Sequence, residues 1–142
     1  MHYSQIISSL ALASGTAMGL GALISPRWAS GVVRLVADPD PARPGGYSEF
    51  RATYGGLFLM AHLSALLITL NLPAIYAGFA ALPLALGWIG AGLGRLISLM
   101  ADKRENRGRG LIPVWIPLEI AIGLAIGSNL LQIYDIIRTF TR

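Results

Sequence analysis

The sequence predicts an all-α fold, namely an integral membrane bundle of four transmembrane helices with a short interfacial helix after the first. Its 142 residues are 54% hydrophobic and only 13% charged, whereas soluble domains average about 25% charged residues. Four apolar stretches each reach the roughly 20 residues that a helix needs to cross the hydrocarbon core. None of them shows the alternation of a barrel strand.

We expect these helices to form a single domain and to cover residues 3–24, 48–70, 73–100 and 111–137. The first stretch could instead be a signal peptide. However, residues 1–5 carry no Lys or Arg, and the apolar run exceeds the usual ~7–15 residues. A retained helix is therefore favoured. The two residues between the second and third stretches predict an antiparallel helical hairpin.

The interfacial helix is expected over residues 26–37. Ser25 and Pro26 form a favourable cap and first helical position. Apolar residues then recur at helical spacing from Trp28 to Val36, beside arginines that can reach lipid headgroups. The prolines within residues 38–46 end the helix, because repeated prolines forbid its continuation.

The basic residues predict the orientation of the chain in a bacterial inner membrane. Two loops on one side hold seven of them: Arg27, Arg34, Arg43, Lys103, Arg104, Arg107 and Arg109. The other side holds Arg138 and Arg142. The positive-inside rule therefore places both loops in the cytoplasm and both termini in the periplasm. Although the net charge is +4, no basic helix or aromatic platform indicates a nucleic-acid partner.

Glycines at four-residue spacing predict close helix packing, because small residues allow helix backbones to approach each other in lipid. Such pairs are also frequent in membrane proteins in general, so one pair alone indicates little. The glycines expected at helix interfaces are Gly15, Gly19, Gly55, Gly56, Gly90, Gly94, Gly123 and Gly127.

Ionisable residues inside the spans indicate a candidate site, since a charge at the bilayer centre costs at least ~2.5–3.5 kcal/mol. Arg95 lies about 9 Å before the C-terminal end of its helix and Glu119 about 12 Å after the N-terminal end of the next one, so both lie in from the same, cytoplasmic, side. Glu49 and Arg51 open the second helix on that side. We expect Arg51, Arg95 and Glu119 to lie in one connected cluster, with Glu49 nearby. The cluster can be a structural clasp or a site for a headgroup, proton or ligand, and both interpretations stay open.

A second candidate polar site comprises His62, Asn129 and Gln132. A packing role for His62 is favoured over a role as ligand to heme or chlorophyll. The sequence has no cysteine, and no metal site is expected. It also lacks a phosphate-binding loop, a nucleophile elbow and a carboxylate pair with hydrolytic spacing, so no catalytic residues are assigned.

Residues 48–59 (SEFRATYGGLFL), residues 94–98 (GRLIS) with Asp102, and Glu119 in the last helix resemble an uncharacterised family of small bacterial four-helix membrane proteins, domain-of-unknown-function family 4345. The resemblance covers essentially the whole chain and implies the four-helix membrane fold. It supplies no reaction. The hallmark positions that it implies here are Glu49, Arg51, Tyr54, Gly55, Gly56, Arg95 and Glu119.

Two functions are compatible with these features. The favoured one is a non-catalytic accessory or structural subunit that packs against a larger, for example bioenergetic, membrane complex. The alternative is a stand-alone bundle that binds lipid, quinone or another small ligand at the Arg/Glu cluster, with enzymatic or transporter-like activity. The expected partners are membrane lipids and other membrane subunits. No cofactor is predicted, although a bound lipid or quinone is left open.

Overall fold

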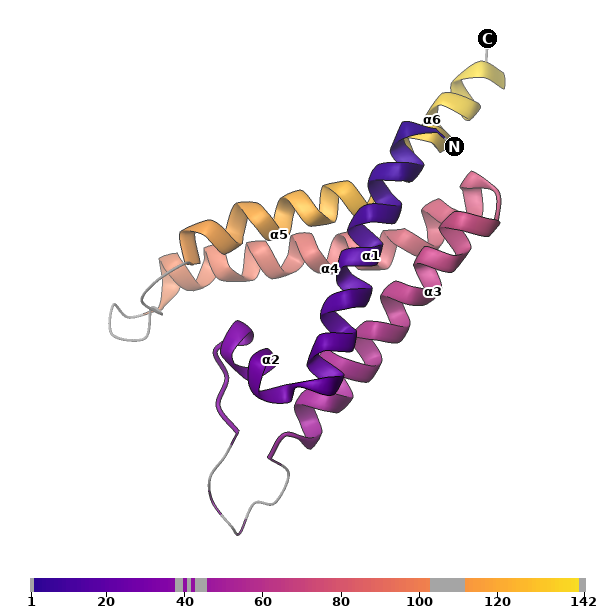
Figure 1. The fold of residues 1–142 in the computed structure, drawn as a ribbon. Helices are drawn as coiled ribbons and strands as arrows, with labels where there is room; N and C mark the ends of the chain where they lie inside the picture. Colours follow the sequence, from indigo (N-terminus) through magenta and orange to yellow (C-terminus); the bar gives the residue numbers. More distant parts are fainter. Residues whose placement is uncertain (1, 38–39, 41, 43–45, 103–111, 141–142) are drawn as a thin grey trace. The chain divides into compact units, whose positions relative to one another are not determined.

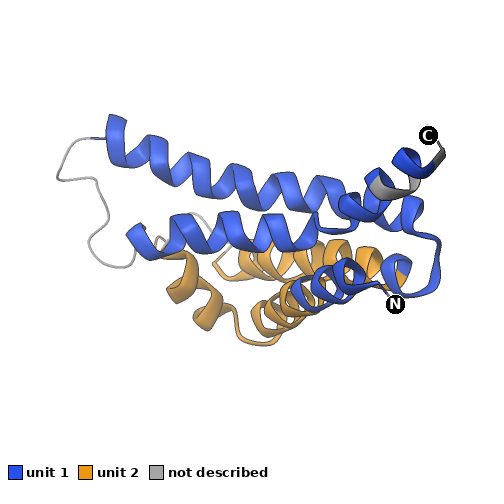
Figure 2. Ribbon diagram, turned by 90° about the horizontal axis from the view of Figure 1, so that it is seen from above, with its two compact units in different colours: residues 1–11, 68–142 blue, residues 12–67 orange. Residues whose placement is uncertain are grey.

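The structure, a computed structural model, describes residues 2–37, 40, 42, 46–102 and 112–140. Within these ranges every regular element is helical, and four helices are long and apolar enough to cross a membrane (Figure 1). The chain divides into two compact units, Met1–Ala11 with Ile68–Arg142 and Leu12–Leu67 (Figure 2). That the chain forms one domain stays a prediction.

Helix α1, Tyr3–Ile24, covers the range expected for the first span. Its 22 residues extend about 33 Å, which matches the thickness of the hydrocarbon core. The boundary between the two units falls inside α1, after Ala11. The N-terminal half of α1 therefore packs within the first unit, and its C-terminal half packs within the second.

Helix α2, Pro26–Val33, is shorter than the expected 26–37. Pro26 occupies its first turn, but the Ser25 side chain makes no capping hydrogen bond. The helix ends because Arg34 adopts a left-handed conformation, with φ 58° and ψ 33°. The N–H of Leu35 then donates to the Ser30 carbonyl at 3.2 Å, which is the six-to-one bond of a Schellman ending.

The second span begins as a π-helix, η1, Phe50–Leu57, and continues as α3, Phe58–Asn71. The sequence predicted a helix over residues 48–70, and the described chain is helical from residue 48 to Asn71. The π-helical winding of its first part was not predicted. The Phe58 N–H donates to the Thr53 carbonyl, five residues back, as in π-helical winding. Phe50 packs with Ala22 and Ala29 in the buried cluster that joins η1 to α1 and α2.

Glycines line the contacts of α1 with η1 and α3 in the second unit. A Cβ on Gly19 would lie 2.5 Å from the Leu59 nitrogen, and one on Gly55 would lie 2.9 Å from Leu23 Cα. Real Cβ atoms essentially never approach other atoms so closely. These two contacts require glycine because each brings two helix backbones together.

In the first unit, α4, Ala74–Ala101, packs against α5, Ile112–Ile126, in antiparallel fashion (Figures 1 and 2). Small residues make the contact: a Cβ on Gly123 would lie 2.7 Å from the Ala85 carbonyl oxygen, and one on Gly92 would lie 2.9 Å from Ile120 Cγ1. Gly127 approaches less closely, with its nearest neighbour, the Ala85 Cβ, at 3.3 Å.

The last span is interrupted, whereas one continuous helix over 111–137 was expected. Helix α5 ends at Ile126, and α6, Asn129–Phe140, follows a turn at Gly127 and Ser128. The Leu130 N–H donates to the Gly127 carbonyl, three residues back, at 3.0 Å. A bond of this spacing is typical of a 3-10 turn, which is wound more tightly than an α-helix. The stretch Pro113–Thr139 remains long and apolar enough to cross a membrane.

Three of the glycines expected at interfaces have no close neighbour. Gly90 and Gly94 are exposed, and a Cβ on either would meet nothing within 4 Å. A Cβ on Gly56 would meet only the Arg51 carbonyl oxygen, at the ordinary distance of 3.7 Å. Helix α4 thus packs on α5 through Gly92 rather than through Gly90 and Gly94. The expected role of Gly90 and Gly94 in helix packing stays a prediction, because no described residue lies against them.

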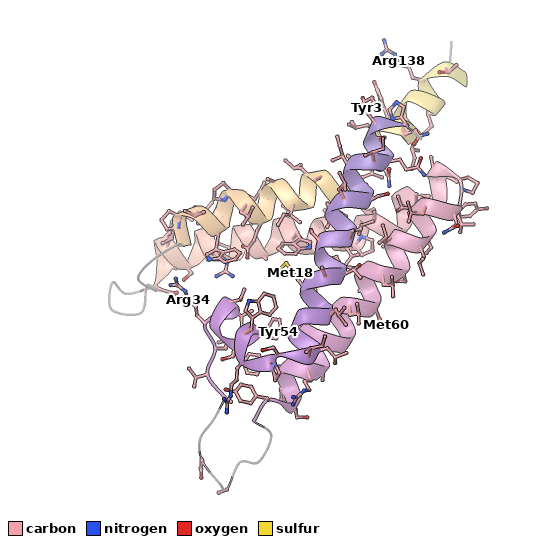
Figure 3. All side chains as sticks on the ribbon, in the orientation of Figure 1. Tyr3, Met18, Arg34, Tyr54, Met60 and Arg138 are labelled. Carbon is pink, nitrogen blue, oxygen red and sulfur yellow. The ribbon has the colours of Figure 1, made fainter. Side chains whose placement is uncertain are left out.

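Large apolar side chains cover much of the outer surface of the spans. Tyr3 on α1 and Met60 on α3, both labelled in Figure 3, are each 61% exposed. The buried core instead consists largely of small residues such as Ala65, Ala77 and Ala81. Apolar surface outside and small residues inside is the pattern expected of helices that pack in lipid.

Candidate functional site

Arg95 of α4 and Glu119 of α5 form an ion pair in the first unit. The Arg95 Nε lies 2.9 Å from each carboxylate oxygen of Glu119. The antiparallel arrangement of α4 and α5 places the two side chains at the same depth, with Arg95 six residues before the end of α4 and Glu119 seven residues after the start of α5. The Glu119 side chain is 6% exposed, whereas that of Arg95 is 37% exposed.

Trp115 completes this site, and sequence reasoning missed it. The Arg95 Cζ lies 6.0 Å from the centroid of the Trp115 ring, within the distance at which a cation is attracted to an indole. Trp115 precedes Glu119 by four residues, so both lie on the same face of α5. That spacing is the sequence signal that could have identified it.

Arg51 has a different partner. Its Nε donates to the Leu23 carbonyl at 3.3 Å, and its side chain is exposed. Leu23 belongs to the last turn of α1, where carbonyls lack intrahelical partners. Arg51 therefore caps α1 within the second unit. Its expected connection to Arg95 and Glu119, which lie in the first unit, stays a prediction.

The other two residues assigned to the charge cluster also lie in the second unit. Glu49 is exposed just before η1. Tyr54 is half-buried, and its ring stacks on that of Phe50 with the centroids 5.8 Å apart. The structure therefore shows Tyr54 as a packing residue of η1.

His62 is fully buried in α3. Its Nδ1 lies 2.8 Å from the Phe58 carbonyl oxygen, and since a carbonyl only accepts, Nδ1 carries the proton and donates. The Phe58 ring lies 4.1 Å away, and the His62 ring fills the space where Gly15 of α1 has no Cβ. This geometry supports the packing role of His62.

A buried polar cluster surrounds the break between α5 and α6. The Ser8 hydroxyl of α1 donates to the Ile126 carbonyl at 2.8 Å and accepts from the Asn129 Nδ2 at 3.1 Å. The Ser128 hydroxyl lies 2.7 Å from the Ser4 carbonyl oxygen and 2.8 Å from that of Ala125. Ser4, Ser8 and Asn129 are all at most 1% exposed.

Sequence reasoning named Asn129 and missed Ser4 and Ser8. Their four-residue spacing extends the face of α1 that carries the interface glycines, and this signal could have identified them. Gln132 is half-buried in α6. Asn129 lies in the first unit and His62 in the second, so their grouping into one polar site stays a prediction.

Three buried polar atoms have no hydrogen-bond partner among the described residues: Ser9 Oγ, Thr69 Oγ1 and Asn129 Oδ1. The orientation of the Asn129 amide follows from its neighbours. Because the Ser8 hydroxyl gives its hydrogen to Ile126, it can only accept from Asn129, so Nδ2 faces Ser8 and Oδ1 faces away. Nearby, the Gln5 amide donates to the Thr69 carbonyl at 2.6 Å.

Within the described ranges, no three His, Cys, Asp or Glu side chains gather to hold a metal ion. Comparisons with protein-family models, with curated proteins and with solved structures find no match to this chain. The resemblance to domain-of-unknown-function family 4345 therefore stays an expectation based on the residues quoted above.

Proposed function

We propose that the protein is a small multi-pass protein of a bacterial inner membrane that serves as a non-catalytic accessory subunit of a larger membrane assembly. The observation that carries this proposal is an open face on α4. Pro83, Gly87, Gly90 and Gly94 repeat at spacings of four, three and four residues and are all exposed. A Cβ on any of the three glycines would meet no atom of the described residues within 4 Å.

This face is distinct from the one that α4 uses inside the chain. At 100° per residue, the four positions cluster on the side of the helix opposite Ala81, Ala85 and Gly92, which are buried. Lipid tails supply no hydrophobic drive between helices, so a face of small residues favours the close approach of another helix. The proposed occupant is a transmembrane helix of a partner subunit.

The membrane setting of the proposal rests on hydropathy and charge. Four helices are long and apolar enough to cross a membrane. The excess of Lys and Arg in two loops supports cytoplasmic loops and periplasmic termini. Most of those basic residues, Arg43 and the four between residues 103 and 109, lie outside the described residues. The proposed helical bundle with α2 on the membrane surface rests on the same argument.

Single cysteines test the open face, because the chain has no cysteine of its own. We expect Gly94→Cys, labelled in membranes with a photoactivatable maleimide, to cross-link to a different membrane protein. Leu93→Cys is the matched control, since it is exposed and lies at the same depth but points about 100° away. An adduct at twice the mass of the chain, or equal adducts from both variants, would overturn the proposal.

The alternative, a stand-alone bundle that binds lipid, quinone or another small ligand, is favoured by the half-exposed guanidinium of Arg95. Purification in a mild detergent separates the two functions. An accessory subunit comes out with partner proteins in fixed stoichiometry. A stand-alone binder comes out alone and carries a small molecule that mass spectrometry identifies.

A further inference from the structure

The guanidinium of Arg95 has donors that no described residue uses. An arginine side chain presents five N–H groups. The Nε–H is shared between the two oxygens of Glu119. Among the described residues, no acceptor bonds to the four N–H groups on the two terminal Nη atoms.

The position of Arg95 limits which acceptor can meet these donors. It lies six residues before the end of α4, about 9 Å along the helix axis. A long arginine side chain covers such a distance by extending towards the headgroups. Trp115 beside it is of the residue type enriched at the membrane interface. The side chain is 37% exposed, so an external group can reach it.

The geometry of the two Nη atoms favours a phosphate group as the external acceptor. They form a planar fork that matches two oxygens of one phosphate group. Glu119 holds the guanidinium only through Nε, so the fork stays available. In the sequence, Lys103, Arg104, Arg107 and Arg109 follow α4 directly, and such a basic segment favours anionic lipid.

We infer that Arg95, oriented by Glu119 and flanked by Trp115, binds a phosphate group, and that an anionic phospholipid headgroup is its source in the membrane. This inference requires that the four apolar helices lie in a membrane, and it does not depend on the partner subunit proposed above. Free inorganic phosphate has the same binding chemistry, so the experiment includes it as a separate arm.

The test measures phospholipid binding to delipidated, full-length protein in a phosphate-free detergent. Phosphatidylglycerol is added back and bound lipid is counted by native mass spectrometry. The informative variant combines Arg95→Gln with Glu119→Gln, because two amides can hydrogen-bond to each other and leave no buried charge unpaired. Arg138→Gln, at an exposed arginine in the last turn of α6, is the matched control.

We expect the double variant to bind phosphatidylglycerol about tenfold more weakly than the wild type, because it loses charge-assisted hydrogen bonds. The Arg138→Gln control is expected to retain wild-type binding. Equal binding by the double variant and the wild type would overturn the inference. If inorganic phosphate raises the melting temperature of the wild type but not of the double variant, the site binds phosphate and its source is the free anion.

Glu119→Gln alone distinguishes a binding site from a purely structural clasp. The amide oxygen of Gln can still accept from the Arg95 Nε, but the negative charge that opposes a phosphate is gone. Phosphatidylglycerol binding is therefore expected to tighten. A clasp without a ligand predicts lower thermal stability with unchanged lipid binding, and that result would contradict the inference.

Discussion

The hydroxyl of Ser8 in α1 donates a 2.8 Å hydrogen bond to the carbonyl of Ile126, the residue at which α5 ends. In a continuous helix that carbonyl would accept from the N–H of Leu130, which bonds to Gly127 instead. A buried carbonyl without a partner costs several kcal/mol in lipid. Ser8 therefore supplies the partner that the helix break removes, and it ties the N-terminal half of α1 to the break.

Ser8→Ala is expected to destabilise the protein by roughly 1–3 kcal/mol, because it leaves both the Ile126 carbonyl and the Asn129 amide without a partner. Unfolding in detergent, followed by circular dichroism, measures the loss. Ser9→Ala is the control on the same helix. Its hydroxyl oxygen is buried and has no hydrogen-bond partner among the described residues, so its removal is expected to be neutral or stabilising. Equal losses for the two variants would contradict the role of Ser8.

Gly123→Ala is expected to lower the melting temperature clearly, and Gly123→Leu to lower it further. The added Cβ would lie 2.7 Å from the Ala85 carbonyl oxygen, so α4 and α5 must separate. Gly90→Ala is the matched control, because its Cβ enters open space and alanine favours a helix over glycine by about 1 kcal/mol. We also expect Leu124→Ala to cost less than Gly123→Leu, since Leu124 is 63% exposed.

The two halves of the Arg95–Glu119 pair are expected to differ in their effect on stability. Arg95→Met leaves Glu119 buried without its partner and is expected to cost about 3 kcal/mol. Glu119→Leu leaves an arginine that is 37% exposed, so about 1 kcal/mol is expected after allowance for solvent. The double variant should recover much of the larger loss. Equal single losses without recovery would show that the pair does not contribute as a unit.

Reporter fusions test the orientation of the chain. Fusions after Asn71 and after Arg107 are expected to report opposite sides, periplasmic for Asn71 and cytoplasmic for Arg107, because basic loops are retained on the cytoplasmic side. Arg107 lies outside the described residues, so the expectation rests on the sequence alone. A periplasmic reading after Arg107 would reverse the proposed orientation.

Hydropathy could not predict how the second and fourth spans are wound. Helix α5 ends before Gly127 and Ser128, but glycine and serine do not by themselves predict a helix end. Helix α1 contains Gly15, Gly19 and several serines and is continuous. The break is stabilised by the hydroxyls of Ser8 and Ser128, which reach carbonyls more than a hundred residues away in the chain. No local pattern contains that information.

Part of the geometry of the Arg95–Glu119 pair could be predicted from the sequence. Depth along each helix follows from residue counts at 1.5 Å per residue, so the matching depths of the two charges were predictable. Which side chain lies beside Glu119 depends on which helices are neighbours. Its pairing with Arg95 requires the packing of α4 on α5 through Gly92 and Gly123, which residue counts do not give. The expected connection of Arg51 to this pair stays a prediction.

By itself, the sequence determined that this chain forms four long apolar helices. The length and hydropathy of a segment are local properties, and they decide whether that segment can cross a membrane as a helix. Only the tertiary structure decided which glycines lie at helix contacts, which polar side chains complete the interrupted span, and which charges are paired. Gly90 and Gly92 illustrate the difference: they stand two residues apart, yet one faces open space and the other faces Ile120. In lipid, which helix faces meet depends on how closely their surfaces fit together. Composition alone does not predict these contacts, because there is no hydrophobic drive between helices in lipid.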